Sequence, residues 1–125
     1  MTAVTPEPII KVAMGFMAAK HLFVASEICL FEALAAGSAT IEELASRTSV
    51  PSQTIAIAAA AMVSLGLIEQ DGDRYQNGEP AAAFLAGKLG PDLRPMLRFF
   101  DQISYPTWQK LADAVRTGVP VPSRG

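Results

Sequence analysis

The N-terminal quarter of the chain is apolar on nearly every side of the helices that it is expected to form. The apolar positions are Ile9, Ile10, Val12, Met14, Phe16, Met17, Leu22, Phe23, Val24, Ile28, Leu30, Phe31 and Leu34. Thr5 and Pro6 suit the cap and first position of a helix. Because the segment is too long for one uncapped helix, we expect a break near Ser26, with Ser26 capping a second helix that ends at Gly37. A helix that is apolar all round must be covered all round, which one small partner helix cannot do.

The composition indicates that part of this apolar surface is covered from outside the domain. The chain has 125 residues, of which 50% are hydrophobic. Charged residues supply 18%, against roughly 25% in typical domains. A small domain has a high surface-to-volume ratio and is expected to be more polar than average. The excess of apolar residues therefore predicts burial against a second chain or a further domain, and we expect a homodimer.

Several classes of partner and location are disfavoured by charge and by segment length. The net charge of −2 gives no attraction to nucleic acid or to an anionic membrane. Cys29 is the only cysteine, so no internal disulfide can form. The longest charge-free stretch, 48–68, has an apolar core of about half of the roughly 18 residues that a membrane span needs. Glu7 and two prolines precede any apolar run, so no signal peptide is visible. We expect a soluble, cytoplasmic protein without a membrane partner.

Residues 39–66 have the sequence pattern of two helices joined by a short turn. Thr40 and Glu43 form a capping box, in which each side chain binds the other residue's free backbone amide. This helix is expected to continue to about Thr48. Pro51 is expected to open the second helix, which carries apolar residues at three- and four-residue steps and which Gly66 ends.

A β-hairpin is predicted directly after these helices. Asp71-Gly72 is a strong hairpin signal, and residues 67–70 and 74–76 flank it as short strands. Two helices followed by a hairpin form a winged helix-turn-helix, which we place at residues 39–76. The expected fold class is therefore mainly α, with one small β-hairpin.

The next residues, 80–118, are expected to be helical. The expected helices are residues 81–86, closed by Gly87; a helix opened by Pro91 and interrupted by Pro106; and a helix capped by Thr107 and ended by Gly118. Residues 1–118 would then form one domain. Residues 119–125 alternate valine and proline at their start and are predicted to be an extended linker.

The residues that catalysis and cofactor binding need are missing from the sequence. The nearest close pair of glycines, Gly87 and Gly90, follows no predicted strand, so no nucleotide-binding turn is expected. His21 lies in the most apolar helix and is expected to pack or to contact a partner chain. Cys29 is expected to be a small buried hydrophobe, because no Lys or Arg lies within a helical turn of it. We expect no catalytic, cofactor-binding or metal-binding residue in this chain.

The predicted winged helix lacks the charges of a DNA-binding one. Residues 48–68 contain no Lys or Arg to contact phosphates. The hairpin carries Asp71 and Asp73 beside the single Arg74 and would repel the DNA backbone. We therefore expect no nucleic-acid partner.

An ordered series of short motifs resembles the N-terminal dimerisation domain of bacterial small-molecule O-methyltransferases that depend on S-adenosylmethionine. The motifs are Gly15-Phe16, Lys20-His21-Leu22, Ala25, Glu27 to Leu34, Thr40 to Ala45, Leu65 to Ile68, Asp71 to Tyr75 and Leu97 to Phe99. The similarity covers roughly residues 8 to 118. Cys29 departs from the pattern, since the family commonly has glycine there.

The resemblance implies a domain that joins subunits and helps to close a substrate cavity. In the family the first helices interlock with those of the second subunit, which assigns Met14, Phe16, Met17, His21, Leu22 and Phe23 to a dimer interface. The regions that match the family's substrate wall are the neighbourhood of Phe16 and the stretch 99–108, from which we single out Phe16, Phe100 and Tyr105. The family's cofactor glycines and catalytic base lie in a C-terminal Rossmann-like domain that would begin beyond Gly125. S-adenosylmethionine is thus implied for the full-length enzyme, and this chain alone is predicted to be inactive.

Two alternative functions remain open at this point. One is a winged-helix transcriptional regulator that binds a small apolar effector. The other is a free-standing dimerisation partner of a full-length homologue. The favoured interpretation is a dimerisation and substrate-lid module for methyl transfer to a small, aromatic or polyketide-like hydroxyl acceptor.

Overall fold

The computed structural model describes residues 3–87 and 91–121, most of which are helical. The helices are α1 (Glu7–Ala13), α2 (Gly15–Glu27), α3 (Leu30–Ala33), α4 (Ile41–Thr48), α5 (Ser52–Ser64), α6 (Glu79–Phe84), α7 (Arg94–Phe99), the π-helix η1 (Phe100–Ser104), α8 (Tyr105–Trp108) and α9 (Leu111–Thr117). The strands are β1 (Ala39–Thr40), β2 (Ile68–Asp71) and β3 (Arg74–Asn77). The expected mainly helical class with a small β-structure is confirmed.

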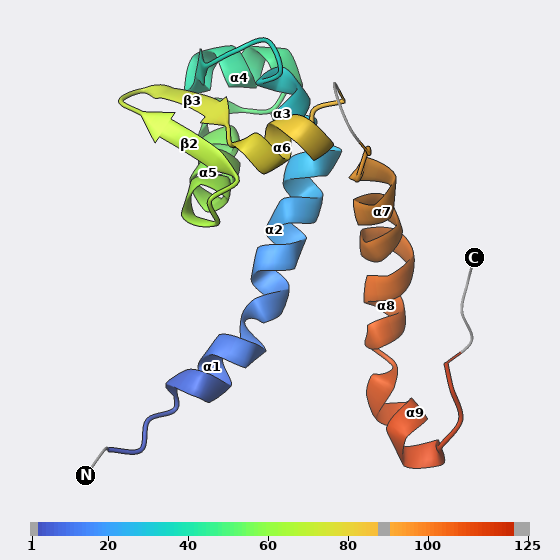
Figure 1. The fold of residues 1–125 in the computed structure, drawn as a ribbon. Helices are drawn as coiled ribbons and strands as arrows, with labels where there is room; N and C mark the ends of the chain where they lie inside the picture. Colours follow the sequence, from blue (N-terminus) through green and yellow to red (C-terminus); the bar gives the residue numbers. More distant parts are fainter. Residues whose placement is uncertain (1–2, 88–90, 122–125) are drawn as a thin grey trace.

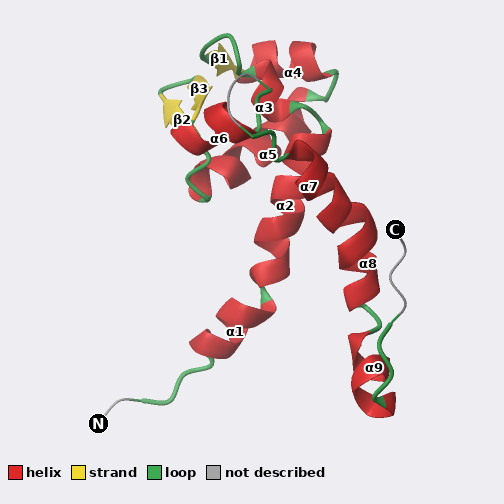
Figure 2. Ribbon diagram, turned by 45° about the vertical axis from the view of Figure 1, so that its right-hand side comes forward, coloured by secondary structure: helices red, strands yellow, loops and turns green. Residues whose placement is uncertain are grey.

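Two helical legs extend from a head that contains α3 to α6 and the strands (Figure 1). One leg consists of α1 and α2, and the other of α7, η1, α8 and α9 (Figure 1). The legs leave the head close together and diverge toward their ends in both ribbon views (Figure 2). Each leg therefore presents side chains that the rest of the chain does not cover.

The first leg is long and apolar enough to cross a membrane, judged by length and composition alone. The span Glu7–Glu27 has 21 residues; a window of 18 residues within it has a mean hydropathy of 1.4, and 11% of that window is buried within the chain. The sequence expectation rested on the charge-free stretch 48–68, whereas the helical span that is long enough lies earlier in the chain and contains Lys11 and Lys20.

The breaks in the N-terminal helices differ from those expected. Pro6 is the cap of α1, and Thr5 makes no capping hydrogen bond. A first interruption falls at Met14, between α1 and α2. Ser26 lies inside α2, so the prediction that it caps the next helix is wrong. The break occurs instead at Cys29, because its left-handed backbone (φ 64°) cannot continue a right-handed helix.

Cys29 is exposed, so the expectation of a buried small hydrophobe is wrong. Its φ of 64° and ψ of 34° lie in the left-handed region, which favours glycine because glycine has no Cβ. This explains why glycine is common at this position in the family that the sequence resembles. Desolvation and the nearby Glu32 carboxylate raise the pKa of the Cys29 thiol, so the thiol stays protonated near neutral pH.

Replacing Cys29 by glycine is expected to stabilise the fold. Cys29→Gly removes the clash between Cβ and the backbone and should raise the free energy of unfolding by about 1 kcal/mol. Ser26→Gly, three residues earlier and inside α2, is the matched control and should lower it, because glycine is a poor helix former. Chemical denaturation of both variants measures the difference. A loss of stability in Cys29→Gly would contradict the strain at this turn.

The head forms largely as expected. The capping box is present, with the Thr40 amide donating to Glu43 at 3.0 Å and the Glu43 amide donating to the Thr40 hydroxyl at 3.2 Å. The helices that follow match α4 and α5. The hairpin turn lies one residue later than predicted, at Gly72-Asp73, because Asp71 pairs with Arg74. β1, which was not predicted, pairs antiparallel with β3 and gives the strand order β1-β3-β2.

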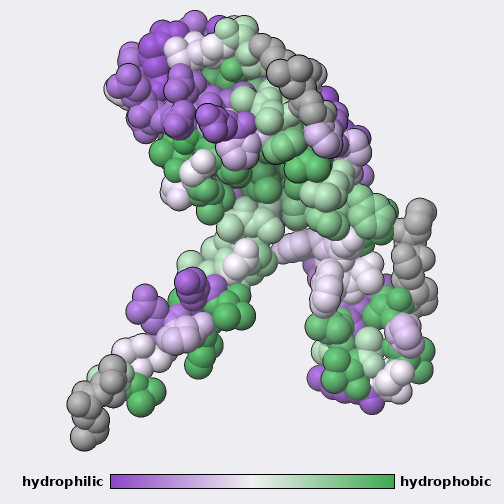
Figure 3. Space-filling model, viewed as in Figure 1, coloured by the Kyte–Doolittle hydropathy of each residue, from purple (hydrophilic) through white to green (hydrophobic). Residues whose placement is uncertain are grey.

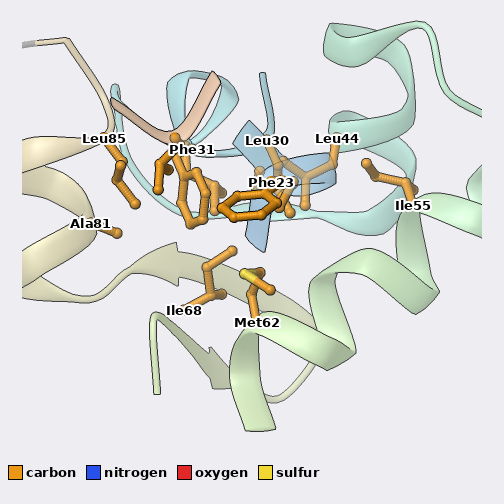
Figure 4. Close-up of a cluster of buried hydrophobic side chains, with 13 residues drawn as sticks. Phe23, Leu30, Phe31, Leu44, Ile55, Met62, Ile68, Ala81 and Leu85 are labelled. Carbon is orange, nitrogen blue, oxygen red and sulfur yellow. The ribbon is translucent and has the colours of Figure 1, made fainter. Parts of the chain in front are cut away.

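One hydrophobic core joins the head to the upper part of α2. The largest fully buried side chains are Phe31, Leu30, Leu44, Ile55, Met62 and Ile68, which come from α3, α4, α5 and β2 (Figure 4). Phe23 of α2 projects into the same cluster and is 9% exposed (Figure 4). The core therefore fixes the C-terminal half of α2, from which the rest of this leg extends.

The second leg is helical from Arg94 to Trp108 and breaks at Gln109 and Lys110, not at Pro106 as predicted. Pro106 does not interrupt it but stands in the first turn of α8, where a missing amide costs no helical hydrogen bond. Thr107 does not cap a new helix, since its hydroxyl donates to the Ile103 carbonyl at 2.8 Å. Gly118 ends α9 with φ 71°, as expected.

The remaining boundaries differ slightly. α6 begins at Glu79 rather than Ala81, with Pro80 in its first turn. α7 begins at Arg94, three residues after Pro91. Residues 119–121 of the expected linker form no helix or strand, and 122–125 lie outside the described residues.

Candidate functional site

An apolar groove lies between the two legs where they leave the head. Its lining residues are Phe16, Ala19, Phe23, Phe100, Ser104, Tyr105, Trp108 and Gln109, and we call it the aromatic groove. Its volume of about 540 Å³ falls within the range of small-molecule sites, roughly 300–1,000 Å³. The structure brings together all three predicted wall residues, Phe16 from α2 and Phe100 and Tyr105 from the second leg.

The side chains of the second leg that face this groove come from the π-helix η1 and from α8 with the residue after it. The lining positions 100, 104, 105, 108 and 109 recur at steps of three, four and five, which places them along one face of the second leg. Phe99 and Phe100 are adjacent, and their rings pack edge to face with centroids 6.3 Å apart. The sequence analysis missed Ala19 and Gln109, neither of which is aromatic.

The aromatic groove suits a planar apolar molecule with few polar groups. Aromatic walls come from both legs, and the polar groups at the groove are the hydroxyls of Ser104 and Tyr105 and the amide of Gln109. No carboxylate, histidine or cysteine is among the lining residues. The groove can therefore orient and desolvate a ligand but holds no group suited to removing a proton near neutral pH.

A second apolar groove lies on the other side of α2, against α5. Its lining residues are Phe16, Met17, Lys20, His21, Val24, Thr54, Ile57 and Ala58, and we call it the α2–α5 groove; its volume is about 330 Å³. Met17 is 44% exposed and Phe16 51%. Figure 3 shows hydrophobic residues over α2 and along both legs, whereas hydrophilic residues gather over the strands of the head. The predicted interface residues Phe16, Met17 and His21 line this groove.

The other predicted interface residues differ in how much surface they present. Met14, at the turn between α1 and α2, is 50% exposed. Leu22 is half-buried against the core, and Phe23 belongs to the core itself. Phe23 also reaches the edge of the aromatic groove. The interface role of Leu22 and Phe23 remains a prediction, and the structure leaves Phe23 little surface for a partner chain.

An ion-pair cluster around Arg94 fixes the second leg to the head. The Arg94 guanidinium donates to Asp92 at 2.8 Å and to Glu32 of α3 at 3.0 Å. These hydrogen bonds lower the pKa of Asp92 to about 2 and raise that of Arg94. One oxygen of Glu32, Oε1, is buried without a hydrogen-bond partner. Arg94 is therefore the group that compensates the partly buried Glu32 carboxylate.

Loss of Arg94 is expected to weaken the attachment of the second leg. Arg94→Met leaves Glu32 without its partner and should lower the unfolding midpoint at pH 7. Because the pKa of Asp92 is depressed in the folded state, its contribution is present above its ordinary value of 3.8 and lost as the pH falls toward 2.

Thermal unfolding between pH 7 and pH 2 measures both effects. The native chain should lose stability between about pH 4 and pH 2, and Asp92→Asn should show less of this loss. Arg98→Met, one turn further along α7, is the control and should have a smaller effect at pH 7. Equal effects of Arg94→Met and Arg98→Met would contradict the proposed anchoring.

Catalytic and metal-binding groups do not converge in the part of the chain that the structure describes. No set of three or more His, Cys, Asp or Glu side chains within residues 3–87 and 91–121 is placed to hold a metal ion. His21 is exposed beside the α2–α5 groove, and the Cys29 thiol has a raised pKa. The expectation that catalysis and cofactor binding reside elsewhere stays a prediction.

Comparison with known proteins identifies the family. Residues 10–87 match the O-methyltransferase dimerisation domain. The chain belongs to this family. It is 35% identical over 115 residues to the 3-hydroxy-5-methyl-1-naphthoate 3-O-methyltransferase of Streptomyces sahachiroi, with 92% of this chain and 33% of that protein covered. It is 32% identical over 122 residues to the tetracenomycin polyketide synthesis 8-O-methyl transferase TcmO of Streptomyces glaucescens, with 96% and 36% covered.

Solved structures of methyltransferases share the fold of this dimerisation domain. Human N-acetylserotonin methyltransferase in complex with SAM superposes with a TM-score of 0.82 at 27% identity, covering 94% of this chain and 36% of that one. PigF with SAH superposes with a TM-score of 0.85 at 28% identity, covering 92% and 38%. The dimerisation domain thus spans about a third of the length of the methyltransferases that it matches.

Proposed function

We propose that this dimerisation domain serves an S-adenosylmethionine-dependent O-methyltransferase in two ways. Along one side of α2 it joins two copies into a homodimer, and along the other it supplies an apolar wall for a small acceptor. The observation that carries the proposal is the pair of exposed apolar grooves on α2, which share Phe16. Cofactor binding and proton removal are assigned to a C-terminal Rossmann-like domain.

The exposed surface of the first leg supports a homodimer. Val12 is 82% exposed, Ile9 74% and Ile57 of α5 60%, all in an otherwise structured region. Exposed apolar area of this extent mostly marks a contact surface. Family membership also supports a homodimer, since the matched family is named for dimerisation. We propose that the first leg interlocks with that of a second copy.

Disruption of the α2–α5 groove is expected to prevent dimerisation. Met17→Glu buries a charge in the interface and should weaken association by roughly 3 kcal/mol, about a hundredfold in the dissociation constant. Gln53→Glu, an exposed polar position on α5, is the control and should leave association unchanged. Sedimentation equilibrium at micromolar concentration measures both variants.

Two results would count against the dimer. One is a folded native monomer in sedimentation equilibrium. The other, from a separate flotation experiment, is binding of the native chain to phospholipid vesicles, which the hydropathy of Glu7–Glu27 would permit. A dimer that stays free of vesicles would support both the homodimer and the proposed cytoplasmic location.

The aromatic groove supports a small aromatic or polyketide-like acceptor. Aromatic walls favour planar ligands by stacking, and exclusion of water strengthens the few polar contacts available. Two relatives are named for a naphthoate and for tetracenomycin polyketide synthesis. Another relative, OxyT of Streptomyces rimosus, is an N,N-dimethyltransferase that is 33% identical over 110 residues, covering 88% of this chain and 32% of that protein. Because one domain family accompanies both chemistries, we assign the choice of acceptor atom to the catalytic domain.

The isolated chain is expected to bind an aromatic acceptor analogue weakly and not to bind S-adenosylmethionine. The groove lies beside Trp108, the only tryptophan, so quenching of its fluorescence by 1-naphthol reports occupancy directly. Phe100→Ala should reduce this quenching, and Val115→Ala, on α9 and outside the groove, should not. Calorimetry with S-adenosylmethionine should show no heat of binding. Saturable cofactor binding by the 125 residues would contradict the assignment of the cofactor to another domain.

A winged helix that does not bind DNA completes the proposal. α4, α5 and the hairpin have the order of a winged helix, and α5 carries no Lys or Arg. We expect no mobility shift with duplex DNA at low salt, where phosphate contacts are strongest. A salt-sensitive shift would favour the transcriptional regulator instead. Activity of a separate full-length homologue that rises on addition of this chain would favour the free-standing partner.

A further inference from the structure

We propose that the ion pair between Lys20 and Asp101 sets the width of the aromatic groove. Lys20 Nζ lies 2.6 Å from Asp101 Oδ1, and the pair joins residues 81 positions apart in the sequence. Lys20 belongs to α2 and Asp101 to η1, which form the walls of the groove together with α8. Both residues are positioning residues, because neither lines the groove itself. Their effect on ligand binding rests on the proposed function, whereas their effect on the spacing of the legs does not.

The ammonium group of Lys20 contacts two successive turns of the second leg. Besides Asp101, it lies over the ring of Tyr105, 5.8 Å from the ring centroid. Tyr105 lines the groove, so the cation meets the wall itself. The Asp101 side chain is 16% exposed and that of Lys20 48%. One partly shielded carboxylate and one aromatic face thus hold the ammonium at the point where the legs begin to diverge.

The segment that makes this double contact also carries the aromatic wall. Phe100 and Ser104 of η1 and Tyr105 of α8 line the groove, while Asp101 of η1 meets Lys20 of α2. Asp101 and Tyr105 are four residues apart, so one lysine reaches both. The charged link and the apolar wall therefore come from one short segment.

Apart from Tyr105, which packs against the core cluster, the other contacts that hold the spacing of the legs lie toward the head. Toward the head, Leu97 of α7 is buried in the core, and Arg94 is tied to α3. Beyond Asp101, Trp108 is 65% exposed, Leu111 47% and Val115 72%. The Lys20–Asp101 pair is the outermost ion pair between the legs among the residues that the structure describes. Without it, the second leg can turn about the Leu97 region and open the groove.

Spin labels on the two legs test the spacing directly. Gly15→Cys on the first leg and Lys110→Cys on the second, in a Cys29→Gly background, carry the nitroxides. A Cβ at Gly15 meets no atom within 4 Å. Labelled chains are diluted with excess unlabelled chain, so that only distances within one copy are recorded. Pulsed electron resonance should give a narrow distribution for the native pair and a broader, longer one for Lys20→Met.

The control and the rescue decide between a specific link and a general loss of charge. Lys11→Met removes a lysine from the same leg and should leave the distribution narrow. The exchanged pair Lys20→Glu with Asp101→Lys should restore much of the narrow distribution that each single change broadens. An unchanged distribution in Lys20→Met overturns the proposal. The proposal is also overturned if the exchanged pair broadens the distribution as much as Lys20→Glu alone does.

Ligand binding separates this proposal from the proposed function. Quenching of Trp108 by 1-naphthol should become about two- to fivefold weaker in Lys20→Met, the effect expected of one exposed ion pair, and less so at high salt. Suppose that 1-naphthol does not quench the native chain but the distance distribution still broadens in Lys20→Met. This result would refute the acceptor groove and support the role of the Lys20–Asp101 pair in the spacing of the legs. Broadening without any loss of affinity would refute the effect of the pair on ligand binding and support its effect on the spacing of the legs.

Discussion

The incomplete burial of α2 determines most of what this domain can do. Its C-terminal half is fixed by the core through Phe23 and Ala25, whereas Phe16 and Met17 remain about half exposed. A helix that is apolar on every side gains stability only where each side is covered. The chain itself leaves Phe16 and Met17 partly uncovered, and the proposed second copy and acceptor would cover them. The low content of charged residues in the sequence agrees with this exposed apolar surface.

Features governed by local chemistry could be predicted from the sequence. The capping box at Thr40 and Glu43 follows from side chains that bind the nearest backbone amides, and the glycine that ends α9 follows from its freedom to adopt a positive φ. Resemblance to a known family then brought Phe16, Phe100 and Tyr105 together as a wall, and the structure places all three in one groove.

Features that depend on distant contacts could not be predicted in the same way. β1 exists because Ala39 and Thr40 meet β3, more than thirty residues later. The π-helix η1 directly precedes α8, which has Pro106 in its first turn, and no local sequence signal marks it. Cys29 was judged by its apolar character, yet its backbone conformation decides its place, and only the family's glycine gave a signal for it. Periodicity along one helix carries no information about such constraints.

Phe16 lines both grooves. It therefore links the shape of the proposed acceptor wall to that of the proposed dimer surface, two properties that usually change separately. A substitution there that reshapes the acceptor wall also alters the surface against which the second copy packs. Phe100, Tyr105 and Trp108 carry no such double constraint, since they stand on the opposite leg. Divergence toward new acceptors within this family should therefore proceed mainly through η1 and α8, while the residue at position 16 changes together with its interface neighbours Met17 and Ile57.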